Sequence, residues 1–333
     1  MHVVIRADGG PEIGYGHLVR TSALASELLK RSHDVTYATI TPEHVREVCP
    51  NGVRTELLPA RDDPTPLREF VRDHADVTVT DSYLVDGAYQ QRLRDVSPLV
   101  VIADDARHAI AADVLVNGNL YGADLEYEVI GPQPEWCLGP DYLLLRSAIT
   151  DYASKDPPWR ETPKRAIVTM GGSDVAGMTS IVIRAFDEFK IQVDTIVGPG
   201  VPPGQRELIK ETATSISADI RVIRDPDDLP KRMFQSDFAV TTASTTTYEL
   251  LSLGTPMISV PVTESQELIA RSLQTQDLAT VLDYNPRVED VSSAIGRYVA
   301  NNKLRKDRRT RGRDLIDGQG VIRITDLIET HVA

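Results

Sequence analysis

The chain has 333 residues, of which 36 are Lys or Arg and 49 are Asp or Glu, so its formal net charge is −13. Hydrophobic residues make up 41% and charged residues 26%, which is typical of a folded globular protein and excludes a mainly disordered chain. The acidic balance, with a pI near 5.0, argues against general binding to nucleic acid or to an anionic membrane.

The composition of charged residues is biased, with 28 Arg against 8 Lys and 31 Asp against 18 Glu. Such a surface suits a salty cytoplasm, where salt screens the repulsion between acidic groups; a GC-rich genome is the alternative explanation. Two isolated cysteines, Cys49 and Cys137, form neither a disulfide framework nor a zinc site. The N-terminus reaches a charge too early for a signal peptide, and no apolar run is long enough to span a membrane. We therefore expect a cytoplasmic protein with no membrane partner.

Short apolar strands alternate with helical periods through the first half of the chain. We expect strands at His2–Ala7, Asp34–Ile40, Arg54–Leu58, Val77–Asp81, Leu99–Ala103 and Asp113–Asn117. We expect helices at His17–Arg31, Pro42–Val48, Leu67–His74 and Asp86–Asp95. Several of the strands are apolar in continuous runs, as expected for strands buried on both faces.

Residues 147–164 are polar and proline-containing, which predicts a linker. A second series follows, with strands expected at Arg165–Met170, Val193–Val197, Ile220–Arg224, Phe238–Thr242, Met257–Val260 and near Thr280–Leu282. Its helices are expected at Val175–Phe189, Gly204–Ser215, Leu229–Gln235, Thr246–Leu253 and Ser265–Gln276, followed by two or three more.

This pattern predicts two Rossmann-like, doubly wound α/β domains facing across a cleft, an N-terminal domain at 1–146 and a C-terminal domain at 165–333. The length agrees, because it allows two domains that each have a core. Ligands of such sheets bind beyond the carboxyl ends of the strands, so the turns that follow the strands are where functional residues are expected.

The turn after the first strand contains four glycines between positions 9 and 16, which allow close backbone approach and positive φ angles. His17 and Arg20 follow, one helical turn apart on one face, where the free N–H groups of a helix N-terminus favour an anionic or polar ligand. The spacing departs from G-x-G-x-x-G because Val19 stands at the third glycine position, which disfavours a dinucleotide site. A histidine here suits acid or base chemistry near neutral pH; the alternative is a solvent-facing histidine at a helix start.

Two turns in the second half have matching features. Gly171-Gly172-Ser173-Asp174 follows the first strand of that half, and its N–H groups suit phosphate oxygens. Ser244, Thr245 and Thr246 lie where a hydroxyl-rich strand end enters a helix, and Glu249 follows on that helix. A carboxylate there suits the two hydroxyls of a ribose, and the alternative is an extended N-cap with a surface glutamate.

Further candidates stand on other turns of the first half, at Asp81-Ser82-Tyr83, Asp104-Asp105 and Asn117-Gly118-Asn119. The adjacent Asp104 and Asp105 are a metal candidate, but neighbouring side chains at a strand end point apart and no His or Glu ligands accompany them. We therefore predict no metal. The basic run Lys303–Arg313 is interpreted as a solvated helical face and not as a nucleic-acid patch.

The turns together resemble those of the UDP-2,4-diacetamido-2,4,6-trideoxy-β-L-altropyranose hydrolases of the pseudaminic acid pathway, which have the GT-B architecture. The resemblance spans nearly the whole chain, and its most specific part is the Gly-x-Gly-His-x-x-Arg turn that ends at Arg20. Its motifs are Arg6-x-Asp8, Ile13-Gly14-x-Gly16-His17-x-x-Arg20, Asp81-Ser82-Tyr83, Gly139-x-x-Tyr142-x-Leu144-Leu145-Arg146, Gly171-Gly172-Ser173-Asp174, Thr242-Ala243-Ser244 with Glu249-Leu250-Leu251, and Gln266. One departure is that Arg146 is followed by Ser147-Ala148-Ile149, where the family usually continues Pro-Glu-Phe.

The resemblance implies hydrolysis of a UDP-linked amino sugar without a cofactor, with His17 as the base that activates water. The predicted substrate-binding residues are Asp8, Gly14, Tyr15, Gly16, Arg20, Tyr83, Asn117, Arg146, Gly171, Gly172, Ser173, Asp174, Ser244, Thr245, Thr246, Glu249 and Gln266. Three alternatives remain open: a glycosyltransferase of the same architecture, a non-catalytic nucleotide-sugar binding protein, and an enzyme similar to the UDP-N-acetylglucosamine 2-epimerases.

Overall fold

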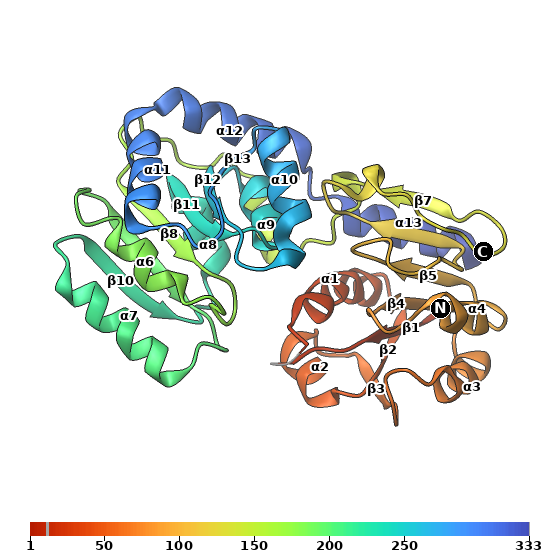
Figure 1. The fold of residues 1–333 in the computed structure, drawn as a ribbon. Helices are drawn as coiled ribbons and strands as arrows, with labels where there is room; N and C mark the ends of the chain where they lie inside the picture. Colours follow the sequence, from red (N-terminus) through yellow and green to blue (C-terminus); the bar gives the residue numbers. More distant parts are fainter. Residues whose placement is uncertain (11–12, 333) are drawn as a thin grey trace. The chain divides into compact units, whose positions relative to one another are not determined.

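The computed structural model describes residues 1–10 and 13–332 and divides into two compact units (Figure 1). Unit 1 comprises Met1–Ser147 and Gly318–Ala333, and unit 2 comprises Ala148–Asp317. Each unit is built on a sheet in which every strand pairing is parallel, with helices connecting the strands. The expected pair of doubly wound α/β domains is therefore confirmed.

The sheet of unit 1 has seven strands in the order β3-β2-β1-β4-β5-β6-β7. Its strands are β1 His2–Ala7, β2 Asp34–Thr39, β3 Arg54–Leu57, β4 Val77–Asp81, β5 Leu99–Ile102, β6 Val114–Asn117 and β7 Glu135–Leu138. Its helices are α1 Gly16–Lys30, α2 Pro42–Val48, α3 Pro64–His74, α4 Gly87–Arg94 and α13 Gly320–Val332, with short 3-10 turns at Gly122–Asp124 and Pro140–Tyr142. The edge strand β7 was not expected from the sequence, because only four residues pair and two of them are exposed.

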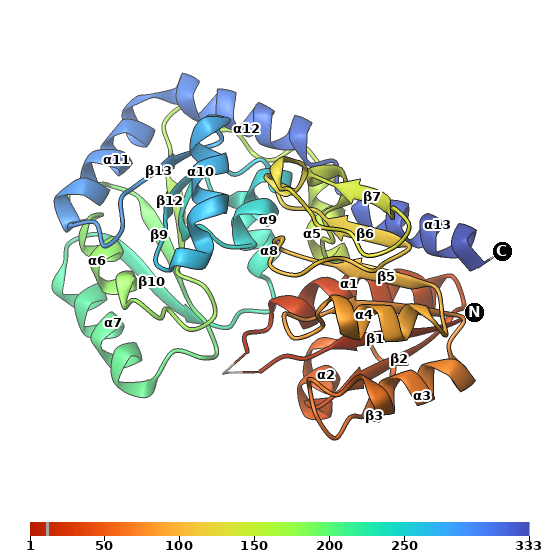
Figure 2. The ribbon, with the colours of Figure 1, turned by 45° about the vertical axis from the view of Figure 1, so that its right-hand side comes forward.

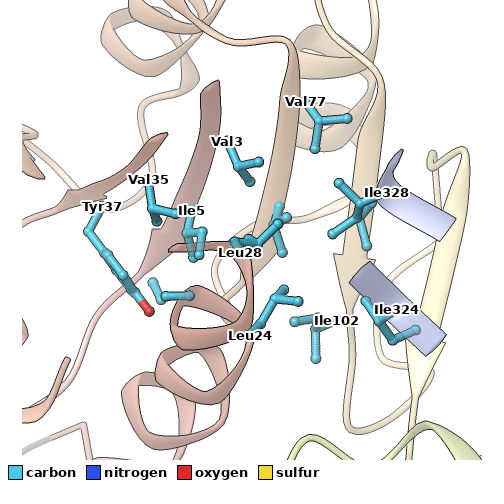
Figure 3. Close-up of a cluster of buried hydrophobic side chains, with 14 of the residues drawn as sticks. Val3, Ile5, Leu24, Leu28, Val35, Tyr37, Val77, Ile102, Ile324 and Ile328 are labelled. Atoms are coloured by element: carbon cyan, nitrogen blue, oxygen red, sulfur yellow. The ribbon is translucent and has the colours of Figure 1, made fainter. Parts of the chain in front are cut away.

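Alternate residues of the central strands pack on opposite faces of this sheet. Val3 and Ile5 of β1 pack with Leu24 and Leu28 of α1 on one face (Figure 3). Val4 between them belongs to a second buried cluster on the other face, which includes residues of α3 and α4. Burying each such side chain contributes about 1.5–3 kcal/mol, so β1 is stabilised by packing on both of its faces and α1 by packing on one of them.

The C-terminal helix belongs to unit 1, which corrects the expected boundary of the second domain at residue 333. Ile324 and Ile328 of α13 lie in the same buried cluster as Leu24 and Ile102 (Figure 3). Arg31 at the end of α1 donates to Asp326 at 2.6 Å and to Glu329 at 2.8 Å. The helical pattern was correctly read, but its apolar face covers the first sheet and not the second.

The sheet of unit 2 has six strands in the order β10-β9-β8-β11-β12-β13. Figure 2 labels β9, β10, β12 and β13 of this sheet. Its strands are β8 Arg165–Thr169, β9 Gln192–Val197, β10 Asp219–Arg224, β11 Phe238–Thr242, β12 Met257–Val260 and β13 Ala279–Val281. Its helices are α5 Ser147–Ala153, which begins in unit 1, α6 Met178–Arg184, α7 Pro203–Ser215, α8 Leu229–Gln235, α9 Thr246–Leu253, α10 Glu267–Thr275, α11 Val288–Ala300 and α12 Asn302–Leu315, with a 3-10 turn at Glu264–Gln266.

The expected linker at 147–164 is hydrogen-bonded to arginines of the basic run Lys303–Arg313. Arg305 donates to the main-chain oxygens of Arg160 and Glu161, and Arg309 donates to those of Pro157 and Pro158. A third arginine of α12, Arg313, likewise donates to the main-chain oxygens of Ala153 and Lys155. The interpretation of this run as a solvated helical face was therefore wrong for these arginines, and Arg305 is fully buried.

No helix within the described ranges combines the length and apolar character that crossing a membrane requires.

Candidate functional site

The strand order of unit 1 reverses between β1 and β4, which makes this the point where a doubly wound sheet opens a ligand-binding crevice. His17 and Arg20 lie on the first turns of α1, directly after the glycine turn that follows β1. Asp81 ends β4, and Tyr83 follows it two residues later. Asp104 follows β5, the next strand of the sheet, so these side chains converge at one sheet edge.

His17 and Asp81 form the centre of the site. The Nδ1 atom of His17 lies 2.6 Å from Oδ1 of Asp81, and both side chains are buried. Because a carboxylate only accepts hydrogen bonds, the proton of this contact lies on Nδ1 of His17. The Nε2 atom has no hydrogen-bond partner in the described part of the chain, and in this tautomer it carries the lone pair that accepts a proton.

Arg20 is held between two carboxylates. Its Nε and Nη2 donate to both oxygens of Asp81, at 2.6 and 2.5 Å. Its Nη1 donates to Oδ1 of Asp104, and its Nη2 lies 3.1 Å from Oδ2 of the same residue. The guanidinium thus forms paired hydrogen bonds with each partner, a geometry that lysine cannot reproduce.

Tyr83 and Asn119 complete the coordination of Asp104. The Tyr83 hydroxyl donates to Oδ2 at 2.8 Å, and Asn119 Nδ2 donates to Oδ1 at 3.2 Å. The Tyr83 ring meets the His17 ring edge to face at 4.8 Å between centroids, and Arg107 stacks over it at 4.2 Å. Tyr83 is 42% exposed and His17 only 8%, so the tyrosine screens the imidazole from solvent.

A cavity of about 30 Å³ borders this cluster, and its wall includes His17, Asp81, Tyr83 and Asp104. Its volume is close to that of one water molecule in the liquid. The cavity wall also includes Thr80, whose buried hydroxyl has no partner among the described atoms. A water molecule therefore fits beside the cluster.

The charges of the cluster follow from its contacts. Burial raises the pKa of Asp81, but the contacts with Arg20 and His17 lower it by more, so the pKa of this carboxyl lies below its usual value. The pKa of Asp104 is likewise held far below its usual value, because Arg20 outweighs burial. Burial, together with the charge of Asp104, raises the pKa of Tyr83. At neutral pH the cluster holds two carboxylates, one guanidinium and a neutral phenol that acts as a donor.

Asp8, predicted to bind substrate, lies in a separate buried network. Its Oδ2 is 2.8 Å from the fully buried Arg6 and 3.2 Å from Arg61. Its Oδ1 accepts hydrogen bonds from the Thr39 hydroxyl and the Ile40 amide, both at 2.9 Å. These contacts connect the carboxyl ends of β1 and β2, so the role that the structure gives Asp8 is to stabilise the junction of these two strands.

The predicted glycines shape the start of α1. Gly14 has a φ of +86° and pairs with Gly10 through two main-chain hydrogen bonds of 2.7 and 3.2 Å. Tyr15 precedes the helix, with its hydroxyl 3.5 Å from His44 Nδ1, and Gly16 is the first helical residue. Among the described residues, a Cβ added at Gly14 or Gly16 would meet nothing within 4 Å, so the space beside both glycines is open.

The predicted residues of unit 2 follow three neighbouring strands. Residues 171–174 follow β8, residues 244–246 follow β11, and Gln266 follows β12 in the 3-10 turn at Glu264–Gln266. The order of this sheet also reverses between β8 and β11, so these turns share its ligand-binding edge. Half-buried Glu249 lies on α9, one turn beyond Thr245 and Thr246.

Asp174 has a structural role that the sequence analysis did not foresee. It is 4% exposed, and its carboxylate accepts hydrogen bonds from the amides of Met178 and Thr179 at 2.8 and 3.1 Å. The helix expected from Val175 therefore begins at Met178, because the four preceding residues form the turn that this carboxylate caps. Asp174 therefore holds the start of α6 in place.

The remaining predicted residues lie outside the cluster. Asn117 accepts hydrogen bonds from Asn119 and donates to Tyr127, so it positions Asn119. Arg146 is half-buried, one residue before the last residue of the first segment of unit 1. Within the described residues, no group of three or more His, Cys, Asp or Glu side chains is arranged to hold a metal ion.

Asp81, Asp104 and Asn119 belong to the cluster but were not among the predicted binding residues. Their sequence signal is their position, because each stands at or just after the carboxyl end of a strand near β1. The expectation that Asp104 and Asp105 point apart is confirmed, since Asp104 binds Arg20 and Asp105 binds Arg107.

No protein-family model matches the chain. The chain is 25% identical to the spore coat polysaccharide biosynthesis protein SpsG of Bacillus subtilis, over 99% of this chain and 98% of that protein. It is 24% identical to the UDP-2,4-diacetamido-2,4,6-trideoxy-beta-L-altropyranose hydrolase of Campylobacter jejuni, over 81% of this chain and 95% of the hydrolase.

Solved structures show the same fold at lower identity. MurG of Acinetobacter baumannii matches with a TM-score of 0.73 and 13% identity, covering 99% of this chain and all of MurG. CalG4, the calicheamicin glycosyltransferase, matches with a TM-score of 0.62 and 14% identity, over 99% of this chain and 98% of CalG4. The fold is that of the GT-B glycosyltransferases.

Proposed function

We propose that the protein hydrolyses a UDP-linked diacetamido-trideoxy hexose to the free sugar and UDP, as a step in nonulosonic (pseudaminic-type) acid biosynthesis. The observation that carries the proposal is the buried His17–Asp81 pair at the ligand-binding edge of unit 1, with Nε2 of His17 left to accept a proton. The name of the Campylobacter jejuni relative supports the choice of substrate and reaction.

His17 acts as the general base of this reaction. A water oxygen forms a bond to the anomeric carbon while the bond from that carbon to the diphosphate oxygen breaks. The proton of the water passes to Nε2 of His17, and Asp81 stabilises the imidazolium that results. The electron pair of the broken bond leaves on UDP, and a single displacement inverts the anomeric centre.

Unit 2 binds UDP in this proposal. The main-chain N–H groups of Gly171 to Ser173 and those at the start of α9 suit the diphosphate, because fixed donors stabilise its growing charge without rearranging. Glu249 is assigned to the ribose hydroxyls and Gln266 to the same half of the ligand. UDP is already a good leaving group, so the two paired carboxylates of ordinary glycosidases are not required.

The test of the base is His17→Asn assayed with UDP-linked 2,4-diacetamido-2,4,6-trideoxy sugars. We expect kcat to fall by about 10²–10⁴, which is what positioned base catalysis contributes. UDP binding, measured by calorimetry, should change little because unit 2 carries it. The matched control is His74→Asn, since His74 is an exposed histidine at the end of α3 and should leave kcat unchanged.

Reaction in heavy-oxygen water separates the alternatives. Water attack at carbon places the label in the free sugar and none in UDP. Turnover without an acceptor excludes an obligatory glycosyltransferase, and NMR of the product at C2 identifies an epimerase. Label in UDP, or a His17→Asn variant with near-normal kcat, would refute His17 as the base at the anomeric carbon.

A further inference from the structure

We propose that Arg20 is not a ligand for the substrate but forms with Asp104 a charge-balancing pair that keeps Asp81 directed at His17 and its charge available to the imidazolium. The inference deepens the proposed function and rests on His17 being the base. It replaces the expectation that Arg20 binds substrate.

The first reason is that the hydrogen bonds of Arg20 are used within the protein. Its Nε and both terminal nitrogens donate to Asp81 and Asp104, with the Nε and Nη2 bonds to Asp81 at 2.6 and 2.5 Å. Its side chain is 17% exposed. A guanidinium engaged in this way by two carboxylates has little capacity left for a phosphate or a sugar hydroxyl.

The second reason is the charge balance around the imidazole. With Arg20 and Asp81 alone the two charges would cancel, and the imidazolium formed during the reaction would gain little from Asp81. Asp104 adds a second negative charge behind Arg20, so the three side chains together carry about one net negative charge. Proton transfer to His17 then neutralises the cluster instead of charging it.

The third reason is that Asp104 makes no hydrogen bond to His17 within the described residues and is held in place by other side chains. Its oxygens accept from Arg20, from the Tyr83 hydroxyl at 2.8 Å and from Asn119 at 3.2 Å. In the described part of the chain, a further charged pair near His17, Asp105 with Arg107, is more exposed and is balanced within itself, with Nη2 of Arg107 2.6 Å from Asp105. Asp104 is therefore a positioning residue whose effect reaches His17 through charge.

Opposite shifts of the His17 pKa test the proposal. Removing the positive charge with Arg20→Gln favours the imidazolium and should raise that pKa, whereas removing a negative charge with Asp104→Asn should lower it. Each shift should be on the order of one unit. The double variant restores the charge balance and should return the pKa to within about half a unit of the wild-type value.

The measurement is an NMR titration of the histidine ring nitrogens of the full chain, with the His17 signals assigned through their loss in His17→Asn. The control is Asp113→Asn, which removes a carboxylate paired with Arg94 at 2.8 Å. Asp113 directly precedes β6, so it lies at the amino ends of the strands, whereas His17 lies at their carboxyl ends. This control variant should leave the His17 pKa unchanged. Arg20→Met and Asp104→Ser replace any single variant that does not fold.

Single variants that shift the pKa in the same direction, or no further than Asp113→Asn does, would overturn the charge-balancing role. Kinetics add a second check, because Arg20→Lys should lower kcat with KM unchanged if Arg20 positions Asp81. A raised KM at constant kcat would instead make Arg20 a substrate ligand. The titration needs no substrate, so it stands or fails independently of the proposed hydrolysis.

Discussion

Asp8 and Asp81 are both buried at the carboxyl ends of neighbouring strands, and each pairs with an arginine. They differ in what else they hold. Asp81 faces a histidine ring, whereas Asp8 is surrounded by structural donors from β1, β2 and the loop at Arg61. The residue type and position are therefore the same, and only the partners separate a candidate catalytic carboxylate from a structural one.

Asp8→Asn should cost about 3–5 kcal/mol of unfolding free energy, because it leaves the fully buried Arg6 without its counter-charge. Burial raises the pKa of Asp8, but Arg6 and the hydrogen bonds lower it by more, so the pKa in the folded protein lies below its usual value. The stabilisation is therefore present above the unfolded pKa of about 3.9 and is lost as pH falls through the folded pKa. Urea unfolding at pH 7 and at pH 3 measures both effects. Unchanged stability with a raised KM would return Asp8 to the binding site.

The sequence indicated His17 and Tyr83 as site residues, because both stand on turns at the carboxyl ends of strands, and the structure brings their two rings into contact. It did not reveal that Arg20 binds two aspartates, since that pairing depends on how β1, β4 and β5 lie side by side. Asp104 and Asp105 are indistinguishable in the sequence, and only their directions in the fold give them different partners.

At the level of elements, strands were predictable because buried parallel strands are continuous apolar runs, and the expected β1, β4, β11 and β12 have the observed bounds. The predicted elements differ from the structure where tertiary contacts override the local sequence pattern. The short, half-exposed β7 depends on its neighbour β6, and α6 starts late because Asp174 caps it. Helix α13 has an ordinary amphipathic sequence that does not say which sheet it covers.

Ile328→Ala should destabilise unit 1 selectively, because its side chain is fully buried between α13 and the first sheet. We expect a loss of about 2–5 kcal/mol. Hydrogen exchange should speed up in peptides from α1 and β5 and stay unchanged in β11 and β12. The matched control is Ile295→Ala, whose equally buried side chain packs in unit 2 and should give the reverse pattern. Equal acceleration in both units would contradict this assignment of α13.

On the scale of the whole molecule, the net charge of −13 is shared by two units that each have their own core. Many acidic groups pair with arginines, but the excess remains and its repulsion opposes the compact state. Salt shortens the range of this repulsion from about 10 Å at 0.1 M to about 3 Å at 1 M.

The melting temperature at pH 7 should therefore rise between dilute and molar KCl. Repeating the scan at pH 5, near the pI of about 5.0, provides the control because the net charge is then close to zero. The rise of the melting temperature with KCl should be smaller at pH 5 than at pH 7. A melting temperature that stays level or falls with KCl at pH 7 would remove the link between acidity and salt tolerance.

The arginines of α12 reach main-chain oxygens of residues 153–161, and this choice of acceptor has a consequence for mutational tolerance. Every residue, proline included, offers a carbonyl oxygen, so most side-chain changes in that segment leave the acceptors in place. The donors have no such freedom, since lysine cannot replace the forked guanidinium. In a saturation library, substitutions should therefore be widely accepted along the segment and rejected at Arg305, Arg309 and Arg313.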